Sequence, residues 1–286
     1  MGAVVPRLPW GAMKYLPVTP EALGHKRWQR YSGYAFACKD SVAPLVVHEL
    51  PKAALHLPLG WVQRPNGFQW VAILGLAPGH NLFVAPDGRW LGGYVPAHFR
   101  SHPFTLANTA DGQQVLCVDT DSGLIHDIHI CSDGEAFFNA DGKPSEALAG
   151  VLNFLTQLAH NRPVSERICA VLAQHQLIQP WALRVQTPNG EQALQGLWRI
   201  DEARLNELGP DALKALQTAG ALPLAYLQLM SMQHLQTLGK LAQTHAQVKA
   251  QAQAQAQAEM PLPTTAKGEL DLEFLHRDGT LSFGHL

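Results

Sequence analysis

The segment His126-Asp127-Ile128-His129-Ile130-Cys131 carries the residue types best suited to holding a metal ion. Neutral imidazole nitrogens and a thiolate are the ligands that zinc prefers. If the segment is a strand, alternation places Asp127, His129 and Cys131 on one face and His126 on the other. Three candidate ligands with no evident fourth make a poor zinc site, so the sequence favours a loop with two histidines and predicts no metal.

Motifs for nucleophilic or nucleotide chemistry are missing. Ser32 lacks the Gly-x-Ser-x-Gly surroundings of an activated serine. Gly92-Gly93 stands alone within a strand pattern and does not belong to a phosphate-binding glycine loop. Asn139-Ala140-Asp141-Gly142 lacks the later glutamate of a calcium loop and fits a hairpin turn better. We therefore predict no cofactor.

Aromatic recognition is a different kind of chemistry, and Trp90 and Tyr94 offer it. Pro86-Asp87-Gly88 is typical of a turn between two short strands, expected over Asn81–Val84 and Arg89–Val95. Alternation then places Trp90 and Tyr94 on one face, with a shallow slot at the glycine between them. Trp, Tyr and Arg are the residue types that anchor interfaces. The candidate binding residues are Asn81, Phe83, Trp90, Tyr94, Arg100, His102 and Phe104.

Two alternatives stay open beside this interpretation. The same aromatic residues could form the core of a β-domain, with Trp and Tyr at its edges. The chain could also be a small-molecule or peptide-modifying enzyme, because catalytic groups meet in space rather than in sequence. The polar groups of such an active site would be His98, Arg100, His102 and Asp119. An enzyme predicts a deep pocket with perturbed titratable groups, and a binding protein predicts an aromatic patch.

The elements that must position these residues change in character near residue 143. Before it, turn pairs such as Asn66-Gly67 and Asp111-Gly112 separate short runs rich in β-branched and aromatic residues, which predicts an antiparallel sheet. A short helix interrupted near Pro51 is expected within 46–57.

After residue 143, apolar residues recur at helical spacing. A helix should begin at Pro144 and end at Asn161-Arg162-Pro163, where a second helix begins. A strand pair over 181–186 and 192–200, a helix over 211–219 and a last helix over about 224–248 should follow. The predicted fold class is α+β, with a strand-rich antiparallel N-terminal half packed against a helical C-terminal half that contains a further β-hairpin.

The predicted organisation has four parts. Residues 1–30 are an N-terminal extension, and 31–245 form the α+β domain, strand-rich over 31–142 and mainly helical over 143–245. Residues 246–262 are a Gln/Ala-rich linker, either a solvated helix or disordered, because its repeated Gln-Ala pairs have no large apolar side chain to bury. Residues 263–286 resemble a β-hairpin that must dock on its own domain or on a partner.

Composition excludes several classes of protein. The 286 residues are 47% hydrophobic, and 21 Lys and Arg against 23 Asp and Glu give a net charge of -2 with no basic cluster, so nucleic acid is not an expected partner. No stretch approaches the roughly 20 apolar residues that cross a bilayer. Met1–Pro20 lacks the pattern of a secretory signal, and the four cysteines form no Cys-x-x-Cys pair. A cytoplasmic location with reduced thiols is the expectation.

The run Gly75–Phe104 resembles the signature of the SapC family, in which Gly-x-Asn-Leu-Phe leads to Gly-x-Trp, Tyr-x-Pro and Arg-x-x-Pro-Phe. The matching residues are Gly79, Asn81, Leu82, Phe83, Gly88, Trp90, Tyr94, Pro96, Arg100, Pro103 and Phe104. The similarity extends over about Tyr31–Leu241, while His80 stands where an acidic residue is usual. The resemblance implies a link to bacterial surface-layer or outer-envelope systems. Together with the aromatic patch it predicts a non-enzymatic accessory protein with a protein or peptide partner of the cell envelope.

Overall fold

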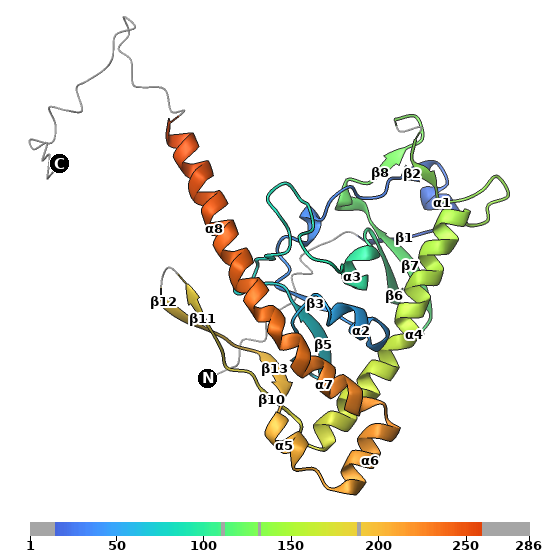
Figure 1. The fold of residues 1–286 in the computed structure, drawn as a ribbon. Coiled ribbons are helices and arrows are strands. Elements are labelled where there is room, and N and C mark those ends of the chain that lie inside the picture. The colour runs from blue at the N-terminus through green and yellow to red at the C-terminus, as the bar shows by residue number, and fades with distance from the viewer. Residues whose placement is uncertain (1–14, 110–111, 131–132, 188–189, 259–286) are drawn as a thin grey trace, which may run out of the picture. The chain divides into compact units, whose positions relative to one another are not determined.

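The computed structural model describes residues 15–109, 112–130, 133–187 and 190–258 (Figure 1). Residues up to Ala242 form one unit and those from Gln243 a second. Within the first unit the antiparallel sheets come mostly from the N-terminal half and the long helices from the C-terminal half, which confirms the predicted α+β class.

The main sheet has five antiparallel strands in the order β10-β13-β4-β5-β3. Its strands are β3 (Val42–Pro44), β4 (Leu59–Arg64), β5 (Gly67–Ile73), β10 (Ile178–Pro180) and β13 (Leu197–Ile200). The hairpin β4–β5 turns at Asn66-Gly67, as its sequence predicts, and pairs Trp61 with Trp70. Trp198 of β13 lies opposite Trp61 on the other side of β4. Both halves of the chain therefore contribute strands to one sheet.

Two three-stranded sheets complete the strand-rich part. One has the order β1-β7-β6 and the other β8-β2-β9. Their strands are β1 (Tyr15–Pro17), β2 (Lys26–Trp28), β6 (Phe104–Asn108), β7 (Gln114–Asp119), β8 (Ile125–Asp127) and β9 (Glu135–Ala136). Between the strands of the three sheets lie the short helices α1 (Pro20–Leu23), η1 (Ala35–Ala37), η2 (Val47–Glu49), α2 (Leu50–Ala53), α3 (Ala97–Arg100) and η3 (Thr120–Ser122). Residues 15–28, expected within an N-terminal extension, thus belong to these sheets.

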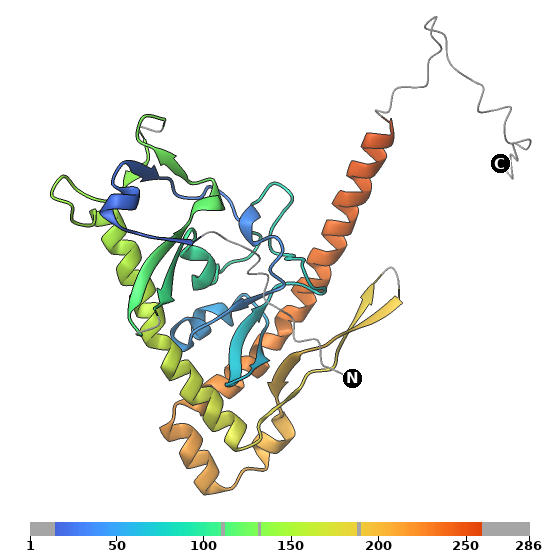
Figure 2. The same ribbon diagram turned by 180° about the vertical axis from the view of Figure 1, so that it is seen from behind.

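Helix α4 (Glu146–Gln174) packs against two separate hydrophobic clusters. Figures 1 and 2 show the course of the helix. Its first half buries Leu148 and Leu155 in a smaller cluster with Trp28, Phe104 and β7. Its second half buries Ile168, Cys169 and Leu172 against the main sheet.

The predicted break at Pro163 is wrong, because α4 continues through it. Side chains two residues before and after it bond to backbone carbonyls of the same helix. Asn161 Nδ2 donates to the carbonyl of Gln157 (2.8 Å), and Ser165 Oγ donates to the carbonyl of Asn161 (2.7 Å). Ser165 Oγ also accepts from the backbone N–H of Val47 (2.8 Å), which fixes the helix to η2. Tertiary packing thus outweighs the cost of an interior proline.

The remaining C-terminal elements differ in detail from the predicted ones. The hairpin β11 (Leu183–Thr187) and β12 (Gly190–Leu194) ends before Gly196, whose φ of 82° separates β12 from β13. The predicted strand 192–200 is therefore two strands in two sheets. Helices α5 (Glu202–Asn206) and α6 (Pro210–Thr218) follow, the latter as predicted.

The predicted last helix is divided into α7 (Ala221–Ser231), η4 (Met232–His234) and α8 (Leu235–Ala258). In α7, Gln228 lies fully buried, accepting from the N–H of Ile200 and donating to the carbonyl of Leu59 (both 3.0 Å). It therefore binds the helix to β13 and β4. The Gln-Ala repeat is helical as far as Ala258, and the predicted tail hairpin lies outside the described residues. Over the described ranges, no helix is both long and apolar enough to span a membrane.

Candidate functional site

The expected hairpin around Pro86-Asp87-Gly88 is present only as a turn. A single antiparallel bridge joins Val84 and Trp90, and neither predicted strand forms. Asn81 and Phe83, two candidate binding residues, are buried at 1% relative exposure. Asn81 Nδ2 donates to the carbonyl of Ala37, and its Oδ1 accepts from the N–H of Phe83. These two residues hold the loop in place and do not reach a surface.

The predicted slot between Trp90 and Tyr94 is closed. The indole of Trp90 turns back over the loop, and its Nε1 donates to the backbone carbonyl of Tyr94 (2.9 Å). A Cβ added at Gly92 would lie 2.9 Å from Trp90 Nε1 and 3.0 Å from Phe83 Cδ1. No space for a ligand group remains there. The Trp90 ring packs instead on Phe83, Tyr34 and Phe99, at centroid distances of 5.5, 5.5 and 5.8 Å.

Tyr94 belongs to a polar chain that ends at the surface. The carboxylate of Glu49 is buried at 6% exposure, and its Oε2 accepts from the hydroxyl of Tyr94 (2.9 Å) and from the N–H of Ala97 (2.8 Å). Its Oε1 accepts from the N–H of Val46 (3.0 Å). The hydroxyl of Tyr94 in turn lies 3.4 Å from an Nη of Arg100. Burial and the neighbouring Glu49 carboxylate raise the pKa of Tyr94, so its hydroxyl stays protonated.

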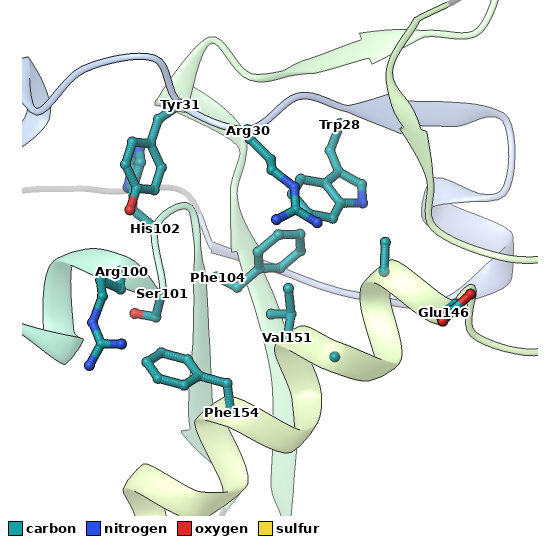
Figure 3. Close-up of a pocket in the computed structure, with 12 residues that line it drawn as sticks. Trp28, Arg30, Tyr31, Arg100, Ser101, His102, Phe104, Glu146, Val151 and Phe154 are labelled. Atoms are coloured by element: carbon teal, nitrogen blue, oxygen red, sulfur yellow. The ribbon is translucent and has the colours of Figure 1, made fainter.

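Beyond Arg100 lies an open cleft of about 760 Å³, which we call the Arg100 cleft (Figure 3). Three segments far apart in sequence form it: residues 28–31, the end of α3 with the start of β6, and the first turns of α4. Its lining residues are Trp28, Arg30, Tyr31, Arg100, Ser101, His102, Phe104, Glu146, Ala147, Gly150, Val151 and Phe154. Arg100, His102 and Phe104 were predicted as binding residues, whereas Asn81, Phe83, Trp90 and Tyr94 do not line it.

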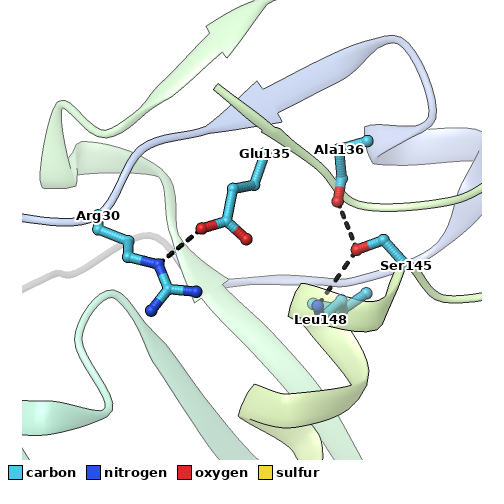
Figure 4. Close-up of polar contacts among 5 residues, drawn as sticks. All are labelled: Arg30, Glu135, Ala136, Ser145 and Leu148. Atoms are coloured by element: carbon cyan, nitrogen blue, oxygen red, sulfur yellow. Dashed lines mark hydrogen bonds and ion pairs between the residues drawn. The ribbon is translucent and has the colours of Figure 1, made fainter. Parts of the chain in front are cut away.

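Helix α4 presents one face to the cleft. Ala147, Gly150, Val151 and Phe154 recur at the three- and four-residue spacing that defines a helix face. The helix begins at Ser145, whose Oγ accepts from the N–H of Leu148 (3.2 Å) and donates to the carbonyl of Ala136 (2.6 Å), as Figure 4 shows. A Cβ at Gly150 would meet no atom within 4 Å, so the absence of a side chain there widens the cleft.

Two guanidinium groups line the cleft. Arg100 lies over the rings of Phe154 and Tyr94, at 5.1 and 5.8 Å from their centroids, and no carboxylate of the described ranges forms an ion pair with it. Arg30 lies 5.9 Å from the Trp28 ring centroid, and its Nε pairs with Glu135 (2.6 Å, Figure 4). Arg100 is therefore the cation that is available to a ligand.

His102 and Tyr31, which also line the cleft, are uncharged at neutral pH. Burial, with His98 nearby, lowers the pKa of His102 to about 4, so its ring is neutral at neutral pH. The ring stacks on Phe36 at 3.8 Å. Burial raises the pKa of Tyr31 to about 12, so its hydroxyl keeps its proton.

The groups of the enzyme alternative meet only in part. His102 and Arg100 line the cleft, but the carboxylate of Asp119 accepts from the N–H of Asp121 in its own turn (3.0 Å). In the metal candidate, Asp127 forms an ion pair with Lys26 (3.1 Å), and Cys131 lies outside the described residues. Within the described residues, no three His, Cys, Asp or Glu side chains are grouped to hold a metal ion.

The cleft residues that sequence reasoning missed are Trp28, Arg30, Tyr31, Ser101 and the α4 face. The first two stand in the part of the chain assigned to an extension, and their contacts are long-range: Trp28 pairs with β8 and β9 through β2, and the Arg30 side chain pairs with Glu135. The α4 face had a local signal, because a glycine at position 150 interrupts the apolar run Ala147–Leu152.

Fold and site define an α+β protein with an open, aromatic, arginine-bearing cleft. The SapC family profile matches residues 19–238, and the chain belongs to this family. The matched region includes residues 28–31 as well as the Gly75–Phe104 signature. Comparison with curated proteins and with solved structures gave no match.

Proposed function

We propose that this chain is a non-enzymatic accessory protein that binds a peptide segment of a bacterial surface-layer or outer-envelope protein in the Arg100 cleft. Family membership supports the envelope link, through the resemblance described above. A cytoplasmic location, expected from the sequence, is part of this proposal, and cell fractionation tests it.

The observation that carries the proposal is the composition of the cleft. The partly exposed rings of Tyr31 and Phe154 line it together with Arg30 and Arg100, over a floor formed by the buried rings of Trp28 and Phe104, each 3% exposed. Aromatic and arginine side chains contribute most of the binding energy at protein interfaces. The cleft is open to solvent, which suits a segment of another protein better than an enclosed small molecule.

Gly150 provides a direct test. Replacing it with Phe places a ring in the cleft, and because the added Cβ meets no neighbour, the helix should accept the change. Ala149→Phe is the matched control, since Ala149 is exposed on the same helix and does not line the cleft. The tagged full-length chain and both variants are expressed in the native host, and retained proteins are quantified by mass spectrometry.

We expect one envelope or surface-layer protein to be retained by the unmodified chain and by Ala149→Phe and lost with Gly150→Phe. Equal retention by both variants would place the partner elsewhere on the molecule. A preparation that retains only a small molecule would favour the enzyme alternative. Thermal unfolding of each purified variant establishes that the loss does not come from misfolding.

A further inference from the structure

We infer that the Arg100 cleft recognises a carboxylate of its peptide, with Arg100 as the anchor and the buried Glu49–Tyr94 pair as the positioning element behind it. This inference rests on the proposed function and names the chemistry of the segment that is bound: an acidic residue next to an aromatic or aliphatic one.

The first observation is that the Arg100 guanidinium forms no ion pair with a carboxylate of the described residues. A guanidinium has five N–H donors, and the contact with Tyr94 uses one of them. Glu135, the acid nearest to the other arginine, is already bound to Arg30. Arg100 therefore has donors left for a bidentate contact, the geometry in which arginine binds a carboxylate best.

Neighbouring side chains hold the Arg100 guanidinium in position. Its guanidinium lies over Phe154 and Tyr94, and the Tyr94 hydroxyl is held by the Glu49 carboxylate, which backbone N–H groups of Val46 and Ala97 orient. An exposed arginine normally loses side-chain entropy when it binds, and this support reduces that loss. Tyr94 is thus a positioning residue rather than part of the contact surface.

The opposite end of the cleft carries the opposite charge. Glu146 lies at the far end of the lining residues from Arg100 in Figure 3. Glu146 and Phe154 are separated by roughly 12 Å along the axis of α4, and Arg100 stacks on Phe154. About four extended residues span such a distance. The bound segment therefore has its acidic residue at Arg100, an apolar side chain against the partly exposed Val151, and a neutral or basic residue near Glu146.

Labelled, C-terminally amidated peptides test this by fluorescence anisotropy with the full-length protein. The acidic probe is Gly-Glu-Phe-Ala-Ala-Lys-Gly, and the neutral probe has Gln in place of Glu. The acidic and the neutral probe are each also made with their residues in reverse order, so that both chain directions are tested. We expect the better acidic probe to bind roughly tenfold more tightly than its Gln counterpart.

Arg100→Gln should remove this preference, and Arg100→Lys should keep part of it, because Lys retains the charge without the fork. Tyr94→Phe should weaken the acidic probe about threefold, and should change nothing when Arg100→Gln is already present. A purely structural role of Tyr94 would weaken both probes in both backgrounds. High ionic strength should reduce binding of the acidic probe more than binding of the Gln probe, which keeps only the contact of its Lys with Glu146.

Equal affinity for the Glu and Gln probes, both lost with Gly150→Phe, would overturn the carboxylate anchor and leave peptide binding in place. Unchanged binding of the acidic probe in Arg100→Gln would overturn it as well. If no probe shows saturable binding up to millimolar concentration, the inference fails, and the proposed function is decided by the capture experiment alone.

Discussion

The hydroxyl of Tyr94 donates to the buried carboxylate of Glu49 over 2.9 Å, although the two residues come from different segments of the strand-rich half. Sequence reasoning placed Tyr94 on a surface patch. The structure shows that its ring is half-buried and that its hydroxyl points toward the Glu49 carboxylate, to which it is the only side-chain donor among the described residues.

Tyr94→Phe should therefore lower the free energy of unfolding by about 2 kcal/mol, because hydrogen bonds to a charged group are among the stronger ones. Urea denaturation of the two proteins measures the difference. Tyr226→Phe is the control, since that side chain is 45% exposed, and it should change stability by less than about 0.5 kcal/mol. A Tyr94→Phe protein as stable as the unmodified chain would show that water replaces the lost donor.

Pro163→Ala should stabilise the protein by about 1–3 kcal/mol, because an interior proline removes a backbone N–H donor and costs about 3 kcal/mol in a helix. Pro163 is exposed, so no packing is lost with its ring. Asn153→Ala, at another exposed position of α4, controls for general helix propensity and should gain at most about 0.7 kcal/mol. Thermal unfolding followed by circular dichroism compares the three chains, and equal gains in both variants would contradict the prediction.

Burial and the Arg162 charge lower the pKa of His98 to about 4, and His102 also lies nearby. Between pH 6.5 and 4 the unfolded chain binds more protons at this position than the folded one, so its contribution to stability is complete above pH 6.5 and is lost as the pH falls. The loss is at most about 3 kcal/mol.

His98→Gln should therefore flatten the fall in stability between pH 7 and 5, measured by urea denaturation at each pH. Asp40 contributes with the opposite sign, since burial raises its pKa to about 6. For this reason the pH dependence of stability is compared between each variant and the unmodified chain. His160→Gln, at an exposed position, should leave the curve unchanged. Parallel curves for His98→Gln and the unmodified chain would refute this assignment.

Gly75→Ala should destabilise the protein by about 3 kcal/mol or more, because the added Cβ would overlap the backbone carbonyl oxygen of His80. Gly239→Ala should instead gain roughly 0.5–1 kcal/mol, since this helical glycine has open space around its Cα. Differential scanning calorimetry of both variants checks the contrast. If Gly75→Ala unfolds at the same temperature as the unmodified protein, the loop must move to accommodate the added Cβ.

Local signals in the sequence predicted the elements that local physics decides. Asn66-Gly67 predicted the β4–β5 turn, and Pro210 and Gly220 predicted α6. The prediction failed where a distant contact decides the outcome. Pro163 should end a helix, but Ser165 holds the continued helix against Val47 of η2.

The site was predicted in part for the same reason. The family signature led to Arg100 and Phe104, and the interpretation of the same run as a binding patch added His102; all three line the cleft. Strand alternation, however, assumed a regular hairpin for Trp90 and Tyr94, and the chain bends at Gly92-Gly93 instead. Nothing local to Trp28 or Arg30 indicates that they face α4, because that contact exists only once β2 has paired with β8 and β9.

The pairing of Trp61 with Trp198 has a consequence for how the protein is made. During synthesis β4 and β5 leave the ribosome long before β13, so β4 waits with an open edge until residue 200 has been added. Such an edge pairs readily with other chains. Until β13 is added, chaperones or early-folding segments must therefore shield the exposed edge of this hairpin. We expect a chain interrupted before β13 to aggregate rather than to persist as a smaller folded protein.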